Sequence, residues 1–411
     1  MLSLYTLKSA KDAATYYQKG DYYTQGGTQD HSQWFGRGAE QFGLTGAVDF
    51  EVFQNLLEGR LPNGDLMSQT ANGAYHRPGY DLTFSPPKSV SILALVAGNK
   101  TVLEAHREAV QQVLKELEDK YAGYRDKKNG VTSIERSKQL TVATFEHSDS
   151  RAGDPNVHTH CVIMNVTQKP NGDFRTLYAD EFYKDVLLLG KKYESGLALA
   201  LMKRGYELKL TENGHFEIKG VPTQLIPLYS KRSGQINQWL EDNQLSGSKA
   251  AEKANFMTRA TKVFVDSVER LNRWQQELTG AACSLSEMQA LEKEAEMRGP
   301  VLPPNPKELA EQAVNAATLH LEEWRNTFSL QDLIKSAKRL SLLNVNEGEL
   351  LDAIEQKISD QALFYLENKL LSTPQTKQRD EQNQLAMQDG KEAVQKIMPR
   401  WIADINSKNN I

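Results

Sequence analysis

Two stretches near the middle of the chain alternate apolar and polar residues in the manner of β-strands. Residues 140–147 read LTVATFEH and residues 158–167 read HTHCVIMNVT, with many β-branched side chains. The polar segment between them, SDSRAGDPNV, contains the turn formers Gly153, Asp154 and Pro155. Two strands joined by a short polar loop predict an antiparallel hairpin.

Elsewhere helical patterns alternate with short strands, which indicates an α+β fold. A capping-box pattern at Ser9 and Asp12 predicts a helix that runs through Lys19. The charged segment at residues 125–129 is expected to be a loop, and from Pro222 onward helical periodicity prevails. Further helices are predicted over residues 50–61, 88–96, 101–121 and 181–204, and further strands over residues 80–85, 206–210 and 215–218.

A proline-rich segment divides the chain. The sequence RGPVLPPNP contains four prolines, and we expect a linker at residues 299–306. The remainder, residues 307–411, is expected to be a small, mostly helical module. It is compatible with a winged helix, because residues 363–371 read as a short β-wing.

Composition and charge are those of an ordinary globular protein. The chain of 411 residues is 39% hydrophobic and 25% charged, and its net charge of −4 does not favour nucleic-acid binding, although a local basic groove is compatible with it. Two distant cysteines, Cys161 and Cys283, indicate a reducing compartment. There is no apolar run of 18 residues and no signal-peptide pattern, so we expect a soluble, cytoplasmic protein without membrane insertion.

Three histidines of the predicted hairpin are candidate metal ligands. His147 ends the first strand, and His158 and His160 begin the second on one face, because they are two residues apart. A lone histidine on an apolar strand is usually a structural residue. Three histidines at the strand ends, with side chains on the same face of the sheet, predict a metal site with open coordination positions. Alternation turns Cys161 to the opposite face, and His106 lies on the apolar stripe of its helix, so both are predicted to be core residues.

Two tyrosine pairs, Tyr16-Tyr17 and Tyr22-Tyr23, lie within eight residues near the N-terminus. A tyrosine hydroxyl can cut a phosphodiester and keep its energy as a phosphotyrosine. Two pairs would supply one nucleophile for cleavage and another for a second strand exchange. Paired tyrosines also serve packing or an interface, and the chemical interpretation depends on a metal site nearby.

Asp81 is an acidic residue inside an otherwise apolar strand. Its burial costs desolvation free energy unless it has a partner. A histidine ring nitrogen is one such partner, since metal-bound histidines usually donate to a carboxylate. Alternatively Asp81 caps the turn at Pro86-Pro87. The spacing alone favours neither interpretation.

In combination these motifs resemble the conjugative relaxases of the MobF class, the F-plasmid-type members of the HUH endonuclease superfamily. The resemblance is carried, between residue 1 and about residue 280, by the two tyrosine pairs, GRGAEQFGLTG, YDLTFSPPKSVSILALV and FEHSDSR…DPNVHTHCVIMNVTQ. It implies an antiparallel sheet with flanking helices as a catalytic palm, over residues 1–230. It also implies helical fingers, over residues 231–298, that close over single-stranded DNA.

The resemblance implies metal-dependent, site- and strand-specific nicking of plasmid transfer-origin DNA. The product is a covalent 5′-phosphotyrosine, and strand transfer and religation follow. The three histidines would hold a divalent metal ion and Tyr16 would make the first nick. Asp81 would assist a histidine or tyrosine, and Tyr22 or Tyr23 would serve the later transfer.

The metal and the partners follow from the same likeness. Three imidazoles favour Mn, Zn, Co or Ni over Mg by ligand softness, while the availability of Mg or Mn decides the matter in cells. The implied partners are single-stranded DNA at a transfer origin, other relaxosome proteins and a type IV secretion coupling protein. A monomer in the donor cytoplasm is expected, and transfer to the recipient with the DNA is compatible with the class.

Two alternatives and three departures accompany this hypothesis. A rolling-circle replication initiator would use the same chemistry, and a metal-stabilised, non-catalytic protein could bind single-stranded DNA by stacking bases on its tyrosines. Only four residues, QKGD, separate the tyrosine pairs, which is slightly tight for the class. Thr159 stands where the superfamily has an apolar residue, although relatives in this class also carry threonine. No Walker motif is present, so residues 305–380 resemble only the lead-in to a helicase motor.

Overall fold

The computed structural model describes residues 1–22, 32–67, 76–211, 213–245, 247–258, 265–367 and 369–397. The chain divides into two compact units. The larger combines residues 1–211 and 215–304, and the smaller is formed mainly by the residues from 305 onward. Apart from residues 212–214, the ranges predicted as palm and fingers both lie in the larger unit. Within the described ranges, no helix is long and apolar enough to cross a membrane.

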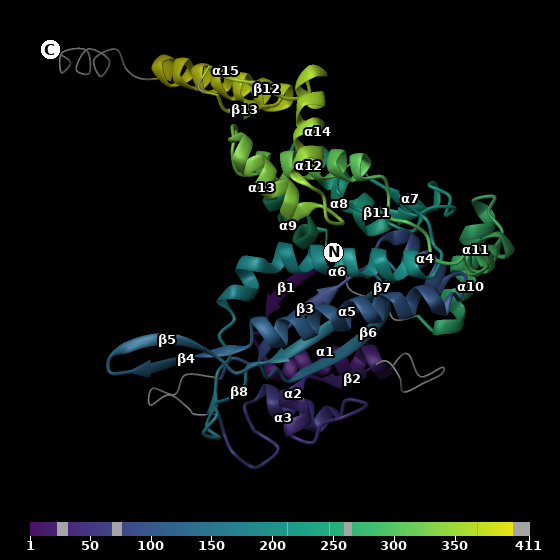
Figure 1. The fold of residues 1–411 in the computed structure, drawn as a ribbon, viewed down its shortest axis with the longest axis vertical. Helices are drawn as coiled ribbons and strands as arrows, with labels where there is room; N and C mark the ends of the chain where they lie inside the picture. The colour runs from purple at the N-terminus through teal and green to yellow at the C-terminus, as the bar shows by residue number, and fades with distance from the viewer. Residues whose placement is uncertain are drawn as a thin grey trace. The chain divides into compact units, whose positions relative to one another are not determined.

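An antiparallel sheet of five strands forms the centre of the larger unit, in the order β1-β3-β7-β6-β2 (Figure 1). Its strands are β1 Leu2–Thr6, β2 Ser32–Phe35, β3 Gly79–Phe84, β6 Val142–Asp149 and β7 Pro155–Met164. The predicted hairpin is confirmed as β6 and β7, the two strands beside each other in the middle of the sheet. Its loop is shorter than predicted, because pairing continues beyond the histidines to Asp149 and Pro155.

Helices cover both faces of the sheet, so the predicted α+β class is confirmed (Figure 1). On one face, α5 (Lys100–Lys120) packs against α6 (Asp180–Lys203), and α4 (Lys88–Leu95) packs against β7. On the other face, α1 (Ala10–Tyr22) and α3 (Phe50–Leu57) share a buried apolar cluster with β2, β6 and β7. A short helix, α2 (Arg37–Gln41), follows β2.

Capping residues set where these helices begin. The Ser9 side chain accepts a hydrogen bond of 3.2 Å from the Asp12 backbone, as the capping-box pattern predicted. Helix α1 then continues to Tyr22, beyond the predicted end at Lys19. At α5, the side chain of Asn99 accepts from the backbone N–H of Val102, which satisfies one of the free donors at the helix start.

The prediction of a loop at residues 125–129 is wrong. The segment belongs to a two-stranded ribbon of β4 (Gly123–Lys128) and β5 (Val131–Arg136). Asn129 and Gly130 connect the strands with φ angles of 51° and 84°. Two residues with positive φ match the twist of the flanking strands, which is why Asn-Gly is a strong hairpin signal. The many charged residues of the segment led to the loop prediction despite this hairpin signal.

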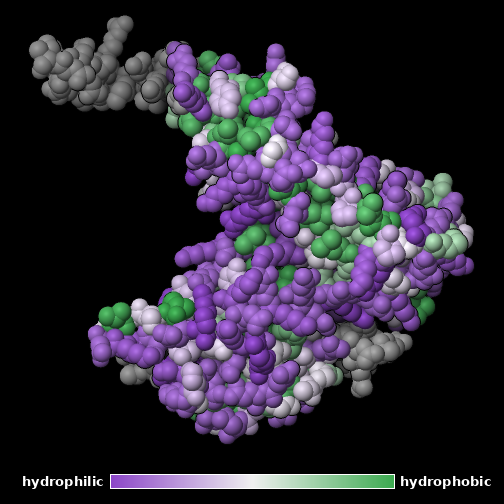
Figure 2. Space-filling view, in the orientation of Figure 1, coloured by the Kyte–Doolittle hydropathy of each residue, from purple (hydrophilic) through white to green (hydrophobic). Residues whose placement is uncertain are grey.

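The rest of the larger unit is mainly helical. Short hairpins and one helical turn follow the sheet: β8 Thr167–Gln168, β9 Phe174–Arg175, β10 Leu208–Leu210, β11 Phe216–Ile218 and α7 Leu225–Leu228. The helices are α8 Lys231–Asp242, α9 Ser248–Met257, α10 Ser267–Gly280 and α11 Leu285–Arg298. The visible surface of this unit is mostly hydrophilic, with separate apolar patches (Figure 2).

The smaller unit has its own apolar core, built from three helices and a hairpin. Its elements are α12 Pro306–Glu322, α13 Leu330–Leu340, α14 Glu347–Ser359, β12 Phe364–Tyr365, β13 Leu371–Ser372 and α15 Pro374–Ile397. Phe328, between the first two helices, pairs with Leu371 of the hairpin.

Candidate active site

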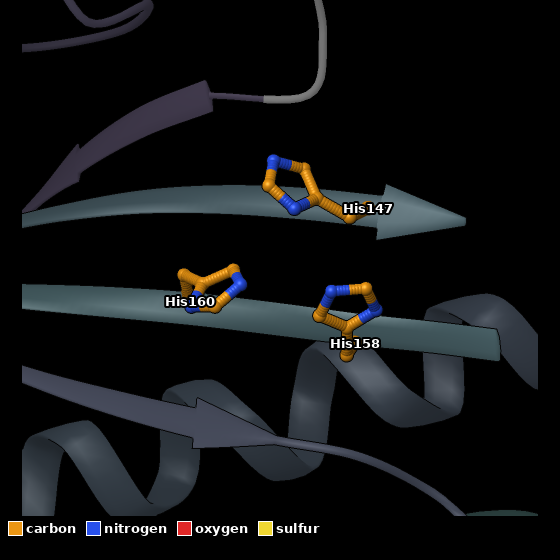
Figure 3. A group of neighbouring side chains, drawn as sticks. All are labelled: His147, His158 and His160. Carbon is orange, nitrogen blue, oxygen red and sulfur yellow. The ribbon is translucent and has the colours of Figure 1, made fainter. Parts of the chain in front are cut away.

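His147, His158 and His160 converge on one face of the sheet, as the spacing predicted (Figure 3). The strand register places His147 directly opposite His158. The three ring centroids are 5.0 to 5.2 Å apart, and one nitrogen of each ring lies within 4.8 Å of the others. This is the donor set and the spacing of a three-histidine metal site.

Hydrogen bonds orient two of these rings. The Nδ1 atom of His160 donates to Asp81 Oδ2 at 2.8 Å, and that of His158 donates to the Asn156 carbonyl at 2.9 Å. Because both acceptors lack a proton, Nδ1 carries the ring hydrogen and Nε2 keeps its lone pair. Nε2 of His160 is buried and has no hydrogen-bond partner among the described residues. This pattern is typical of metal-binding histidines, so the residues fit a divalent metal ion.

Asp81 is buried on β3 and has the partners that its burial requires. Besides the bond from His160, its carboxylate accepts from the Tyr17 hydroxyl at 2.8 Å and from Thr83 Oγ1 at 3.3 Å. Of the two interpretations left open by the sequence, the contact with a histidine is the one present. Asp81 therefore connects the histidine cluster to the first helix.

Tyr16 and Tyr17 have opposite environments although they are neighbours on α1. Tyr16 is 41% exposed, and its ring lies edge-on to His160 and His147 with centroids 5.8 and 6.2 Å away. Tyr17 is 2% exposed and stacks on Phe145 at 4.9 Å. Burial raises the pKa of Tyr17 far above its usual value, and the negative charge of Asp81 adds to this effect. Tyr17 therefore stays protonated at neutral pH.

A cleft of about 590 Å³ opens beside these groups. Tyr16, Asp81 and His160 form part of its lining. The remaining wall is partly aromatic and partly charged, and it includes Tyr5, Lys8, Ser9, Arg151, Glu252, Asn255 and Phe256. An exposed phenol, a histidine cluster and a cleft are therefore present in one place.

Comparisons with known proteins agree with this geometry. A family model described as TrwC relaxase matches residues 10–281. The chain belongs to the TrwC relaxase family. The predicted resemblance to MobF-class relaxases is thereby confirmed.

Two relatives and several solved structures document the match. The chain is 36% identical over 390 residues to the multifunctional conjugation protein TraI of Escherichia coli, and 34% identical to that of strain K12. Each alignment covers 90% of this chain but 21% of the relative, so the chain spans about a fifth of their length. A copper-bound conjugative relaxase TrwC in complex with oriT DNA superposes with a TM-score of 0.65 at 39% identity, covering 69% of this chain and all of that one. A TrwC complex with a 27-mer DNA comprising the recognition hairpin and the cleavage site gives a TM-score of 0.63 at 36% identity, with the same coverage.

The second tyrosine pair of this TrwC-family chain is only partly described. Tyr22 is the last residue of α1, but its side chain lies outside the described residues, as does the whole of Tyr23. The roles predicted for both remain predictions.

The loop between the histidine strands is held by α10. Arg270 donates to Ser148 Oγ at 3.0 Å, and Arg273 and Trp274 donate to the Gly153 carbonyl at 2.6 and 2.8 Å. Arg270 therefore binds the end of β6, next to His147, while Arg273 and Trp274 hold the loop itself.

Sequence reasoning missed several side chains of the cleft, among them Tyr5, Arg151 and Phe256. Arg151 lies in the hairpin loop next to the histidines, and this position was the available signal. Phe256, on α9, is 74% exposed, and no local pattern distinguishes it from a core residue of an amphipathic helix.

Proposed function

We propose that this protein is a conjugative relaxase that nicks one strand of transfer-origin DNA by attack of Tyr16. The observation that carries the proposal is the exposed ring of Tyr16 beside His147 and His160, whose nitrogens converge to within 4.8 Å. Membership of the TrwC relaxase family supports it. The TrwC structures in complex with oriT DNA support the same substrate.

His147, His158 and His160 would hold a divalent metal ion. When bound, the ion supplies positive charge that neutralises the scissile phosphate and favours ionisation of the phenol. Asp81 accepts a hydrogen bond from Nδ1 of His160 and the Asn156 carbonyl accepts one from Nδ1 of His158, which leaves the lone pair of these two rings on Nε2. By softness the three imidazoles favour Mn, Co, Ni or Zn over Mg.

The chemical step follows from the position of Tyr16. Its phenolic oxygen attacks the scissile phosphorus, and the bond from phosphorus to the 3′ oxygen breaks. The phenolic proton leaves to water, because Tyr16 is exposed while Asp81 is already engaged by Tyr17 and His160. The 3′ oxygen takes up a proton from water and departs as a hydroxyl, leaving a 5′-phosphotyrosine. Rejoining needs no ATP, since the linkage conserves the energy of the phosphodiester.

Tyr17 acts as a positioning residue in this proposal. Its buried hydroxyl donates to Asp81, and its raised pKa keeps it from becoming a phenolate. The later strand transfer belongs to Tyr22 or Tyr23, as the resemblance implies. In the cleft, Tyr5 and Phe256 offer rings on which bases can stack.

The cellular setting is proposed from the family alone. The partners would be single-stranded DNA at a transfer origin, relaxosome proteins and a type IV secretion coupling protein, with a monomer acting in the donor cytoplasm. We also propose that the smaller unit is a winged-helix module. Its order of three helices and a hairpin, with Phe328 paired to Leu371, supports this.

The test compares Tyr16→Phe with Tyr17→Phe. Each protein is incubated with Mn²⁺ and a labelled single-stranded transfer-origin oligonucleotide, and a denaturing gel resolves the covalent adduct. We expect no adduct with Tyr16→Phe at nearly unchanged DNA affinity, whereas Tyr17→Phe still forms one.

Three other outcomes would contradict the proposal. An adduct in Tyr16→Phe would reassign the nucleophile. A wild-type protein that binds the DNA without forming any adduct would be a non-catalytic binder. Cleavage of a replication origin in preference to a transfer origin would favour a rolling-circle initiator.

A further inference from the structure

A row of three side chains lies directly behind the histidine cluster, on the opposite face of the sheet. Glu146 precedes His147, and Thr159 separates His158 from His160. The strand register pairs Thr159 with Glu146 on one side and with Phe84 of β3 on the other. Because successive strand residues point to opposite faces, this row backs the three rings.

Each member of the row contacts α5 or α6. Neighbouring α5 residues reach the two histidine strands: His106 Nε2 lies 2.8 Å from Thr159 Oγ1, and Arg107 makes two bonds of 2.8 Å to the Glu146 carboxylate. Tyr193 of α6 makes two contacts, one with His106 and one with Phe84 of the row. Its hydroxyl lies 2.7 Å from His106 Nδ1, and its ring packs on Phe84 with centroids 5.2 Å apart.

These contacts are more specific than core packing requires. A buried histidine requires hydrogen-bond partners, but any nearby polar group could supply them. The packing of the sheet against α5 would be satisfied by an apolar side chain at position 159. Here the partner is the hydroxyl of Thr159, the one residue between two of the candidate metal ligands. The sequence predicted His106 as core, and its burial agrees, but its polar contacts connect α5 to the metal site.

We propose that His106 and Arg107 position the three histidines for metal binding, through Thr159 and Glu146. The strands β6 and β7 carry the ligands on one face, so fixing Thr159 and Glu146 on the other face fixes the rotation of both strands. Ligand distances in metal sites tolerate deviations of only about 0.2 Å, so a small strand rotation disturbs the site. These four residues are called the α5 clamp below.

The inference rests on the proposed metal site, and the test separates the two. Co²⁺ is titrated into the full chain, and both its affinity and its visible absorption spectrum, which reports ligand geometry, are recorded. A wild-type protein that binds no Co²⁺ at the histidines would contradict the metal site itself. Binding by the wild type allows the α5 clamp to be tested.

Thr159→Val removes the hydroxyl at nearly constant volume, and Thr159→Ser restores it. We expect Thr159→Val to weaken Co²⁺ affinity about 10-fold, the lower end of the range for residues that hydrogen-bond a metal ligand directly, and to change the absorption spectrum. Thr159→Ser should bind like the wild type. Tyr193→Phe leaves the sequence of both ligand strands unaltered, and it should change Co²⁺ affinity and the absorption spectrum in the same direction. It provides the test of the α5 clamp if Thr159→Val does not fold.

The matched control is Tyr206→Phe. It removes a buried hydroxyl that accepts a bond of 2.7 Å from Asn99 at the start of α5, away from the row. We expect a lower Tm with wild-type Co²⁺ affinity and spectrum. The α5 clamp is refuted if Thr159→Val and Tyr193→Phe bind Co²⁺ like the wild type, or if Tyr206→Phe weakens binding as much as they do.

Discussion

Replacing Asp81 with asparagine tests the buried carboxylate that orients His160. Asp81 accepts bonds from Tyr17 and His160 at 2.8 Å each, and from Thr83 at 3.3 Å. Asparagine has the same shape but only one oxygen, and it adds N–H donors. An amide nitrogen facing Nδ1 of His160 would shift the ring hydrogen to Nε2. That shift would block the nitrogen that a metal ion needs.

The size of the effect follows from the bond that is lost. A hydrogen bond to a charged group contributes about 1.5–3 kcal/mol. At about 1.4 kcal/mol for each factor of ten, this corresponds to roughly 10- to 100-fold in binding. We therefore expect Asp81→Asn to lower Co²⁺ affinity by about 10- to 100-fold in calorimetric titrations of the full chain.

The control is the same chemical change elsewhere. Asp126→Asn replaces a carboxylate on the β4–β5 ribbon that pairs with Lys169 at 3.1 Å, and it should leave Co²⁺ affinity unchanged. If folded Asp81→Asn binds Co²⁺ as tightly as the wild type, Asp81 does not orient His160 and the reasoning fails.

Three further predictions concern the metal, pH and the hairpin loop. Chelation with EDTA should abolish adduct formation, and added Mn²⁺ should restore it on a denaturing gel; cleavage that survives chelation contradicts a metal role. Burial lowers the pKa of His106 from 6.5 to about 4, so between these values the unfolded chain binds a proton that the folded chain does not. The free energy of unfolding should therefore fall as pH drops from about 6.5 toward 4, and urea titrations should show a smaller loss for His106→Gln. Gly153 has a φ of +74°, and an added Cβ would lie 2.6 Å from Arg273 Nη2. Gly153→Ala should therefore cost about 1–2 kcal/mol from backbone strain and lower the Tm in calorimetry.

The histidine cluster could be predicted from the sequence because its geometry is local. The alternation of side chains along a strand places His158 and His160 on the same face. The pairing of the hairpin then places the second strand beside His147. The Asn129-Gly130 turn was equally local, and its signal was outweighed by the surrounding charge. Both features depend on residues within one hairpin.

The difference between Tyr16 and Tyr17 could not be predicted in this way. Which neighbour is buried depends on how α1 lies across the sheet, and that placement is set by packing between segments far apart in the chain. The same holds for His106, whose partners Thr159 and Tyr193 come from two other elements. Helical periodicity identified its burial but not its contacts.

The central claim is that Tyr16 forms the covalent bond with DNA. The wild-type chain is reacted with Mn²⁺ and a transfer-origin oligonucleotide, digested with protease and nuclease, and analysed by tandem mass spectrometry to locate the modified residue. The account predicts a 5′-nucleotide adduct on Tyr16 and none on Tyr17 after a single cleavage. A first adduct on Tyr17, Tyr22 or Tyr23, or the absence of any nucleotide-modified tyrosine, would contradict it.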